Sequence, residues 1–379
     1  MKRHYLDHAS TTLLRPRARE LMGELLAAMA AGELGDPARV HAEGMRARNL
    51  LEDARSSVAA WLAVRPRQVV FTSGATESIA MANHGACTRG ARDGRDQVVL
   101  GAVEHSAVRQ QAQLSPVTSV GVDRHGRVDP EEFIASVGDR TAVAHLQWAN
   151  HEVATLQEVE VVAAALADHP CLLHVDAAQA GSDVPRAVAS GADLVSVSGH
   201  KLGGPPGVGL LVIRAGLRIP PLILGGDQER ARRAGMENLL AVAGLAAAVE
   251  ELSIQSVAEA ERMRGLTDLV AAWADRTEGV SVLGDPLRRA PHLLCLALEG
   301  VEPQPVLLGL DSRGISVHSG SSCSSEAFEP SPVLAAMGVD AQRSLRISVG
   351  WSSTEADVLA ATGALEEVLG ELRALGTAC

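Results

Sequence analysis

The chain has 379 residues, of which 46% are hydrophobic and 21% charged, and its formal net charge is -12. This length leaves room for two domains around a large core, and the acidic balance argues against binding to nucleic acids. The sequence contains no run of 18 apolar residues and no charged-then-apolar leader, so we expect neither a membrane span nor a signal peptide. The five cysteines lack CxxC spacing and the thirteen histidines lack an HExxH pair, so we expect no metal site and a reducing, cytoplasmic compartment.

The first candidate ligand-binding element is a strand, turn and helix start near residue 74. Residues 68–71 predict a strand, the sequence Thr-Ser-Gly-Ala-Thr at residues 72–76 predicts a turn, and a helix follows from Glu77. This arrangement directs backbone N–H groups and the positive end of a helix dipole toward an anion. On its own the pattern is more often an ordinary capped helix start, and it lacks the lysine of a Walker A loop.

Asp176 follows the next informative strand. Residues 171–175 form a short apolar run without helical periodicity, which predicts a buried strand with Asp176 at its C-terminal end. Open α/β sheets build their ligand sites at that end of the strands. An isolated aspartate in this place is more often a helix N-cap, so its interpretation depends on what lies nearby.

A lysine ends the following strand. Residues 192–197 predict a strand, and Ser198-Gly199-His200-Lys201 comes directly after it. The Gly- and Pro-rich turn at residues 202–209 leads into another apolar strand, so we expect Lys201 to be held on a rigid platform.

The C-terminal third predicts a smaller α+β domain. A long helix over residues 237–264 leads into a strand at residues 292–297, and a final helix begins at Glu355. We predict an α/β protein whose large domain, residues 15–250, has a mostly parallel sheet flanked by helices. The small domain comprises residues 1–14 and 251–379.

Two residues of this C-terminal part are candidates for chemistry. Cys323 lies in the small, polar run SGSSCSS at residues 319–325, whereas buried structural cysteines normally have apolar neighbours. A solvent-reachable thiol can ionise and react. Arg346 interrupts an apolar strand, a costly position for a charge that favours a functional role.

Together these residues indicate pyridoxal 5'-phosphate (PLP), because this cofactor ties up a lysine amine as an imine. PLP needs an acid at its pyridine nitrogen, a cradle for its phosphate and a group that covers its ring. The candidates are Asp176 for the acid and Ala75, Thr76, Ser198 and His200 for the phosphate.

Residues 72–78, Glu104-His105, Asp176 with Gln179, and residues 198–201 are similar to the cofactor motifs of cysteine desulfurases. These are PLP enzymes of fold type I in the class V aminotransferase superfamily, and the similarity extends over almost the whole chain. The resemblance implies that Lys201 carries the cofactor, that His105 stacks on its ring and that Gln179 reaches its phenolic oxygen. It also implies a homodimer, because a second subunit completes the site in this fold type.

The implied activity converts L-cysteine to L-alanine. Arg346 would bind the substrate carboxylate, with the bidentate geometry that suits arginine, and Lys201 would remove the Cα proton. Cys323 would take the sulfur as a persulfide and pass it to an acceptor protein that the sequence does not identify. His105 would carry protons to and from the substrate thiol.

Three positions depart from the family pattern. The family usually has Asn-Asn-Glu where this chain has Asn150-His151-Glu152, so a histidine stands in place of an asparagine that contacts the cofactor and the substrate. We expect Asn150 and His151 at the cofactor, since a neutral imidazole still donates one hydrogen bond. Met236 replaces a threonine that donates to the phosphate across the dimer, and Asp36 stands where asparagine is usual.

These departures leave two alternatives open. One is a PLP-dependent C–S or C–Se lyase that acts on a cysteine derivative without a protein thiol. The other is a non-catalytic family member that serves as a scaffold or partner subunit.

Overall fold

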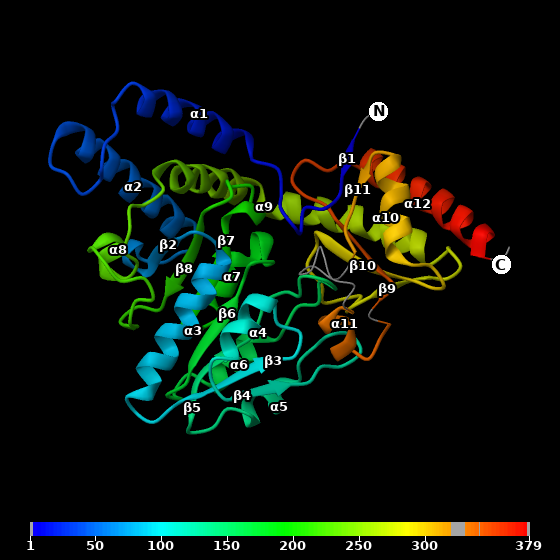
Figure 1. Ribbon diagram of the computed structural model, residues 1–379, viewed down its shortest axis with the longest axis horizontal. Coiled ribbons are helices and arrows are strands. Elements are labelled where there is room, and N and C mark those ends of the chain that lie inside the picture. The colour runs from blue at the N-terminus through cyan, green and yellow to red at the C-terminus, as the bar shows by residue number, and fades with distance from the viewer. Residues whose placement is uncertain (1–2, 320–329, 341, 377–379) are drawn as a thin grey trace.

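The computed structural model describes residues 3–319, 330–340 and 342–376 of the chain. Within these residues, seven strands form one sheet in the order β2-β8-β7-β6-β5-β3-β4 (Figure 1). Strands β7, β6, β5, β3 and β4 run parallel, and β8 is antiparallel to both of its neighbours, β7 and β2. The strands are β2 (Val69–Thr72), β3 (Gln97–Gly101), β4 (Val117–Val120), β5 (Thr141–His145), β6 (Leu172–Asp176), β7 (Leu194–Ser198) and β8 (Gly209–Ile213). The predicted α/β class with a mostly parallel sheet is confirmed.

Helices cover both faces of this sheet, as buried parallel strands require. On one face, α3 and α4 share a hydrophobic cluster with alternate strand residues such as Val70 and Val98. On the other face, α2, α6, α7 and part of α9 pack against the intervening residues such as Val69 and Val99. The helices before α9 are α1 (Pro16–Ala30), α2 (Ala42–Trp61), α3 (Ala75–Ala91), α4 (Ser106–Ala112), α5 (Pro130–Ala135), α6 (Val159–Ala165), α7 (Val184–Ala189) and α8 (Gln228–Ala231), with short 3-10 helices η1 (Pro66–Gln68), η2 (Gly181–Asp183) and η3 (Gly199–Lys201).

A second hydrophobic cluster lies in the C-terminal part of the chain. There β10 pairs antiparallel with both β9 and β12, and α10 and α12 pack with them. The elements are β9 (Val280–Leu283), β10 (Leu293–Leu298), α10 (Pro303–Ser312), β11 (Ile315–Ser316), α11 (Pro332–Ala336), β12 (Ser344–Ser348) and α12 (Glu355–Gly376).

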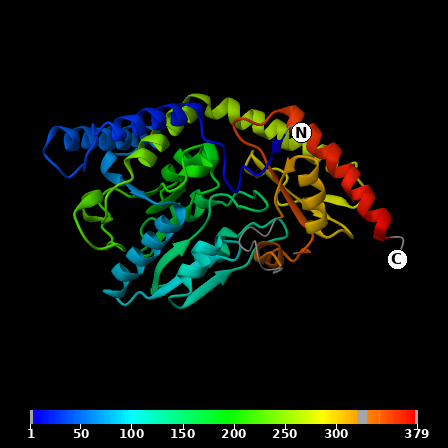
Figure 2. The same cartoon turned by 45° about the horizontal axis from the view of Figure 1, so that its top comes forward.

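Helix α9 (Leu239–Ala274) connects the two clusters and is longer than the predicted helix of residues 237–264. Buried residues between Leu239 and Leu252 contribute to the first cluster, and buried residues between Met263 and Ala274 contribute to the second. Figure 2 shows the helix running from one part of the molecule to the other. The predicted division at residue 250 therefore falls inside a continuous helix, and the domain boundaries stay a prediction.

Helix α9 is also long and apolar enough to cross a membrane by length and composition, with a mean hydropathy of 1.4 over its most apolar stretch. However, 56% of that stretch is buried inside the protein. Its contacts with α1, α2 and the main cluster account for the apolar composition.

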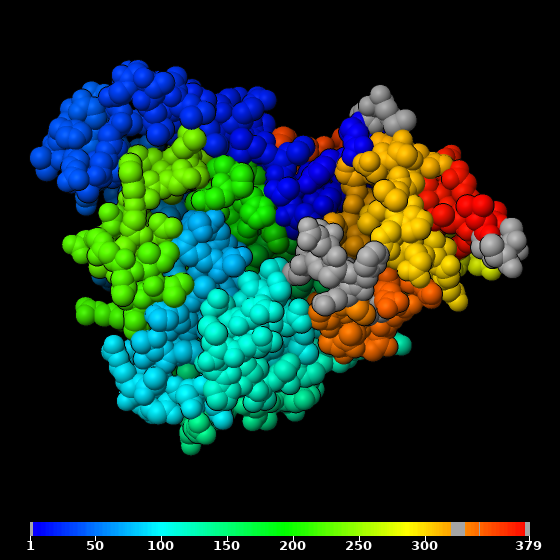
Figure 3. Space-filling view, viewed as in Figure 1, coloured from blue at the N-terminus to red at the C-terminus, as the bar shows by residue number. Residues whose placement is uncertain are grey.

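The N-terminal segment joins the two parts of the molecule. Strand β1 (His4–Tyr5) pairs in parallel with β11, and Asp7 forms an isolated bridge with Ser348 of β12. The chain then crosses to α1, so the segment lies over the junction in Figure 3, where it is dark blue. This crossing brings Asp7 and Ser10 beside residues that lie more than 300 positions later in the sequence.

Candidate active site

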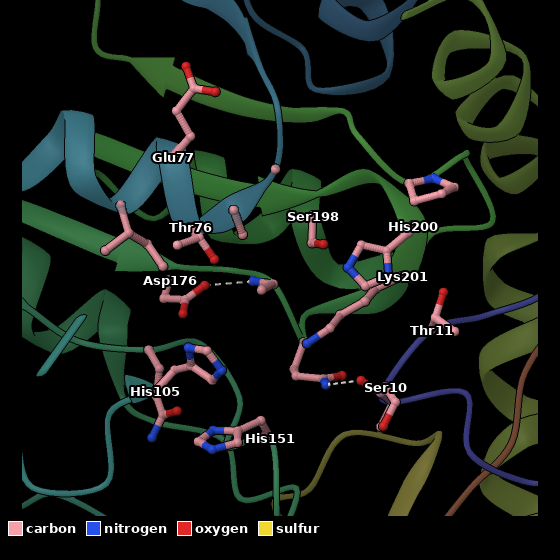
Figure 4. A pocket seen from close by; sticks show the side chains of 18 of the residues that line it. Ser10, Thr11, Thr76, Glu77, His105, His151, Asp176, Ser198, His200 and Lys201 are labelled. Carbon is pink, nitrogen blue, oxygen red and sulfur yellow. Dashed lines mark hydrogen bonds between the residues drawn. The ribbon is translucent and has the colours of Figure 1, made fainter. Parts of the chain in front are cut away.

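A cavity of about 610 Å³ lies at the C-terminal ends of β6 and β7. Figure 4 shows residues from the sheet, from α3 and from the N-terminal segment converging on it. The sequence-predicted residues that line the cavity are Ala75, Thr76, His105, His151, Asp176, Gln179, Ser198, His200, Lys201 and Arg346.

Asp176 and Lys201 enter this cavity from neighbouring strands (Figure 4). Asp176 is the last residue of β6 and is 6% exposed, and its Oδ1 accepts hydrogen bonds from the Ala178 N–H at 2.9 Å and the Ser196 hydroxyl at 3.4 Å. Lys201 ends η3, directly after β7, and is half-buried. The two residues therefore place a fixed carboxyl group and an amine on one cavity wall.

The turn that presents Lys201 depends on glycine. Gly203 and Gly207 have φ angles of +87° and +81°, which lie in the left-handed region that favours glycine. The turn returns the chain into β8, antiparallel to β7. This turn fixes the backbone position of Lys201, which directly precedes it.

The N-terminus of α3 forms another wall of the cavity. Gly74 precedes the helix, and Ala75 and Thr76 begin it. Thr72 and Ser78 hold the turn through a hydroxyl–hydroxyl contact of 2.8 Å. Glu77 also lines the cavity, and its carboxylate accepts hydrogen bonds from the Ser73 N–H at 2.7 Å and from Arg233 at 2.8 Å. The Arg233 contact compensates the negative charge of Glu77 beside the anion-binding helix start.

His105 and His151 lie edge to face, with ring centroids 5.0 Å apart and an interplanar angle of 77°. His105 caps α4, because its Nδ1 accepts a hydrogen bond from the Ala107 N–H at 3.1 Å. Burial holds the pKa of His151 well below its usual range, and the charges of His105, Lys201 and Arg346 lower it further. His151 is therefore neutral near pH 7, and one of its two ring nitrogens carries a proton that it can donate.

Arg346 reaches the cavity from β12 and is 1% exposed. Its Nη1 donates to the His151 carbonyl at 2.9 Å, and its Nη2 donates to the Ser10 hydroxyl at 2.7 Å and to Asp7 Oδ1 at 3.1 Å. These contacts aim a buried cation at the cavity from the C-terminal part of the chain.

Gln179 lines the cavity and is held at both ends of its amide. Its Nε2 donates to the Ala9 carbonyl at 2.8 Å, and its Oε1 lies 3.1 Å from His292 Nε2. Burial lowers the pKa of His292 to about 4, with a further contribution from Lys201. His292 is therefore neutral and can donate to Gln179, which fixes the orientation of the amide.

Asn150 does not line the cavity. It is fully buried, its Nδ2 donates to the Val103 carbonyl at 3.1 Å, and its Oδ1 accepts from the Glu152 and Val153 N–H groups at 2.8 Å. These bonds hold the turn that presents His151. The predicted contact of Asn150 with the cofactor is not tested by this geometry and stays a prediction, and Cys323 lies outside the described residues.

The sequence interpretation missed several residues at or behind the cavity. Ser10, Thr11 and Gln147 line it. Glu104, next to the predicted His105, is 1% exposed and accepts a hydrogen bond from the Gln147 N–H at 2.6 Å. Burial raises the pKa of Glu104 well above its usual range, and the charge of Asp176 raises it further. Glu104 belongs to one of the motifs in which the sequence resembles cysteine desulfurases, but its own role was not predicted, because the sequence does not show burial.

The residues around the cavity match the chemistry that PLP requires. Asp176 and Lys201 face the same cavity, and the N-terminus of α3 together with the polar groups of Thr76, Ser198 and His200 would hold a phosphate group. Close packing holds this cradle in place, because a Cβ atom at Gly209 would lie 2.6 Å from the backbone of Gly74. The residues present therefore fit the cofactor.

Comparisons with known proteins agree with this geometry. The family model described as Aminotransferase class-V matches residues 4–360. The chain is 34% identical to the cysteine desulfurase IscS of Dictyoglomus turgidum over 99% of this chain and 97% of the relative, and 36% identical to a cysteine desulfurase of Gluconacetobacter diazotrophicus over 97% and 94%.

The fold is also similar to those of solved structures. A NifS-like protein superimposes with a TM-score of 0.89 at 31% identity, covering 98% of this chain and 100% of the other. DndA from Streptomyces lividans superimposes with a TM-score of 0.77 at 32% identity, covering 91% and 99%.

Proposed function

The chain belongs to the aminotransferase class-V family. We propose that it is a cysteine desulfurase that transfers the sulfur of L-cysteine to its own Cys323 and releases L-alanine. The observation that carries the proposal is the cavity, where Lys201, Asp176 and Arg346 meet. The curated relatives named cysteine desulfurase match nearly the full length of the chain.

Lys201 would hold PLP, with Asp176 at its pyridine nitrogen and the N-terminus of α3, Ser198 and His200 at its phosphate. PLP bound in this way supplies an electron sink for the Cα of an amino acid. Asp176 suits its position because two protein donors orient the carboxyl group toward the cavity. His105 would cover the ring, since it lines the cavity from α4.

Arg346 would bind the carboxylate of L-cysteine. Its guanidinium is buried and already fixed by Ser10 and the His151 carbonyl, so little side-chain entropy remains to be lost on binding. The amine of Lys201 would take the Cα proton, and His105 would move the proton of the substrate thiol.

The sulfur transfer balances without an added reductant or oxidant. The Cys323 thiolate attacks the substrate sulfur, an S–S bond forms, and the Cβ–S bond breaks. The electron pair of that broken bond remains with the substrate carbon skeleton, which takes up protons to become alanine. The products are L-alanine and a persulfide on Cys323, whose outer sulfur passes to an acceptor protein.

We also propose a homodimer in a cytoplasmic, reducing compartment. The free thiols of Cys87, Cys171 and Cys295 in the described part of the chain support the compartment. The dimer is proposed from the family resemblance, in which a second subunit completes the active site of this fold type. Analytical ultracentrifugation tests the homodimer, and cell fractionation tests the cytoplasmic location.

The experiment that tests the activity is incubation of the purified protein with PLP and L-cysteine, with alanine and sulfide measured in the presence of a reductant. Lys201→Ala should reduce alanine formation by about 10²–10⁴-fold or more, because it removes both the cofactor linkage and the base. Wild-type alanine production by this variant would refute the assignment. If Cys323→Ser retains full turnover on free L-cysteine, the C–S or C–Se lyase replaces the desulfurase, and no turnover by the wild type indicates a non-catalytic member.

A further inference from the structure

The positive charge of Arg346 is compensated inside the protein. Its Nη2 lies 3.1 Å from Asp7 Oδ1, and the two side chains are 1% and 17% exposed. Because so little water reaches this ion pair, the two charges act on each other and on the adjoining cavity with little screening. A carboxylate bound in the cavity is therefore attracted by Arg346 and repelled by Asp7.

Asp7, Ser10 and Arg346 form a closed ring of three hydrogen bonds. Arg346 Nη2 donates to Asp7 Oδ1 at 3.1 Å and to the Ser10 hydroxyl at 2.7 Å, and the same hydroxyl donates to Asp7 Oδ1 at 2.9 Å. Arg346 and Ser10 line the cavity, where Figure 4 shows Ser10, whereas Asp7 is not among the described residues that line it. Asp7 therefore influences a molecule in the cavity through Arg346 and not by direct contact.

The position of Arg346 does not depend on the charge of Asp7 alone. Arg346 Nη1 also donates to the His151 carbonyl at 2.9 Å. The backbone of Asp7 is anchored separately, by its bridge with Ser348 of β12 and by the Ser10 N–H, which donates to the Asp7 carbonyl at 3.2 Å. Asparagine has almost the size of aspartate and keeps an Oδ1 acceptor. Asp7→Asn therefore removes the charge and leaves the hydrogen-bonded ring in place.

The compensating charge bears on the release of the product. L-Cysteine and L-alanine carry the same α-carboxylate, so the attraction of Arg346 stabilises substrate and product equally. Binding that is equal throughout a reaction lowers KM but does not raise kcat. A buried arginine without a compensating charge would therefore also hold L-alanine tightly and slow its release.

We propose that Asp7 is a positioning residue that acts through Arg346. It holds the guanidinium and weakens the affinity of the cavity for the α-carboxylate, so that L-alanine is released. The inference rests on the proposed function for the identity of substrate and product, whereas the effect of Asp7 on a bound carboxylate follows from the ion pair itself.

The test compares L-alanine with ethylamine, which is alanine without its carboxylate, by isothermal titration calorimetry of the PLP-loaded full chain. Asp7→Asn should lower the Kd for L-alanine by about tenfold or more, because it removes a repulsive charge close to the bound carboxylate. The Kd for ethylamine should not change. Asp311→Asn is the matched control, since it removes the same charge from the exposed ion pair with Arg3 and should change neither Kd.

The kinetics provide a second readout. In Asp7→Asn the KM for L-cysteine should fall while kcat does not rise, because the gain in binding is shared by substrate and transition state. A purely structural role of Asp7 would change the binding of L-alanine and ethylamine alike.

Asp7→Ser is a further variant in case Asp7→Asn does not fold, and it should also lower the Kd for L-alanine, since serine is neutral. An unchanged or higher Kd for L-alanine in the folded variants, or an equal change for L-alanine and ethylamine, would overturn the inference. Binding of L-alanine needs no sulfur transfer. If the wild type forms no alanine from L-cysteine while Asp7→Asn still tightens L-alanine binding, the proposed function fails and the inference about Asp7 stands.

Discussion

Arg346 shows how one residue connects distant parts of the chain. Its guanidinium contacts Asp7 and Ser10 from the N-terminal segment and the His151 carbonyl from the main sheet. A charge that is 1% exposed is tolerated only when it is paired and hydrogen-bonded. The same contacts that stabilise it orient it toward the cavity, so its structural role and the substrate-binding role proposed for it coincide in one side chain.

We expect Arg346→Ala to lower the free energy of unfolding by about 3–5 kcal/mol, because it leaves Asp7 and a buried carbonyl without their partner. Arg3→Ala is the matched control, since Arg3 forms an exposed ion pair with Asp311 and should cost about 1 kcal/mol or less. Urea denaturation measures both. Equal effects of the two variants would contradict the central placement of Arg346.

Asn150 and Glu152 show where residue-level inference from sequence is incomplete. Both stand beside His151, yet Asn150 turns into the backbone of its own loop and Glu152 reaches Ser331. Sequence spacing does not give the direction of a side chain in an irregular turn. Partners 179 residues apart, as Glu152 and Ser331 are, become visible only in the folded chain.

At the level of elements, β8 and α3 are packed together through glycine. A Cβ at Gly209 would lie 2.6 Å from Gly74 backbone atoms and 2.8 Å from the Val197 carbonyl. Neither neighbour is a flexible side chain that can move aside. The N-terminus of α3 can therefore lie at the cavity only because Gly209 of β8 has no side chain.

Gly209→Ala should displace the start of α3, with a cost of about 1–3 kcal/mol that is typical of overpacking. Because the displaced helix N-terminus would lose its contact with the phosphate group, we also expect about tenfold weaker affinity for PLP, measured by spectroscopic titration. Gly121→Ala is the control, because a Cβ there meets no atom within 4 Å. Unchanged PLP affinity in Gly209→Ala would show that the cradle does not depend on this contact.

The sequence predicted most elements of the sheet because its buried strands are short apolar runs bounded by turns. The ends of β6 and β7 at Asp176 and Ser198 lie within one residue of the predicted positions. The C-terminal end of α9 was missed by ten residues, since its second half changes partners from one hydrophobic cluster to the other. The antiparallel pairing of β2 with β8 joins strands that are separated in sequence by five other strands, so it depends on tertiary packing.

At the scale of the whole molecule, buried titratable groups give the protein a defined pH dependence. Burial lowers the pKa of six histidines, to about 4 for His8 and His292 and to about 3 for His145, and also lowers those of His151, His174 and His200. Two carboxyl groups, Glu104 and Glu152, shift upward because they are buried.

The two sets act in opposite directions. Below pH 6.5 the unfolded chain protonates the histidines and the folded chain does not, so stability falls as the pH drops toward 4. The carboxyl groups favour the folded state in acid, and their contribution is lost as the pH rises from 4.5 toward 7. Each histidine with a pKa of about 4 lowers the free energy of unfolding by about 3 kcal/mol when the pH falls from above 6.5 to below 4. Because the buried histidines outnumber the buried carboxyl groups, the effect of the histidines dominates.

We therefore predict that the free energy of unfolding rises between about pH 5 and about pH 6.5. Urea denaturation across this range measures the slope. His292→Gln should reduce the slope, because it removes one buried group while an amide can still contact Gln179. Stability that is constant or that increases on acidification would contradict the assignment of neutral, buried histidines.

The central claim is that the sulfur of L-cysteine is transferred to Cys323. Its most direct test is the mass of the peptide that contains this residue. After treatment with PLP and L-cysteine without a reductant, we predict that this peptide gains one sulfur atom, and that Cys323→Ser binds PLP but releases no sulfur. Sulfur found instead on Cys87, Cys171, Cys295 or Cys379, or a fully active Cys323→Ser, would contradict the account.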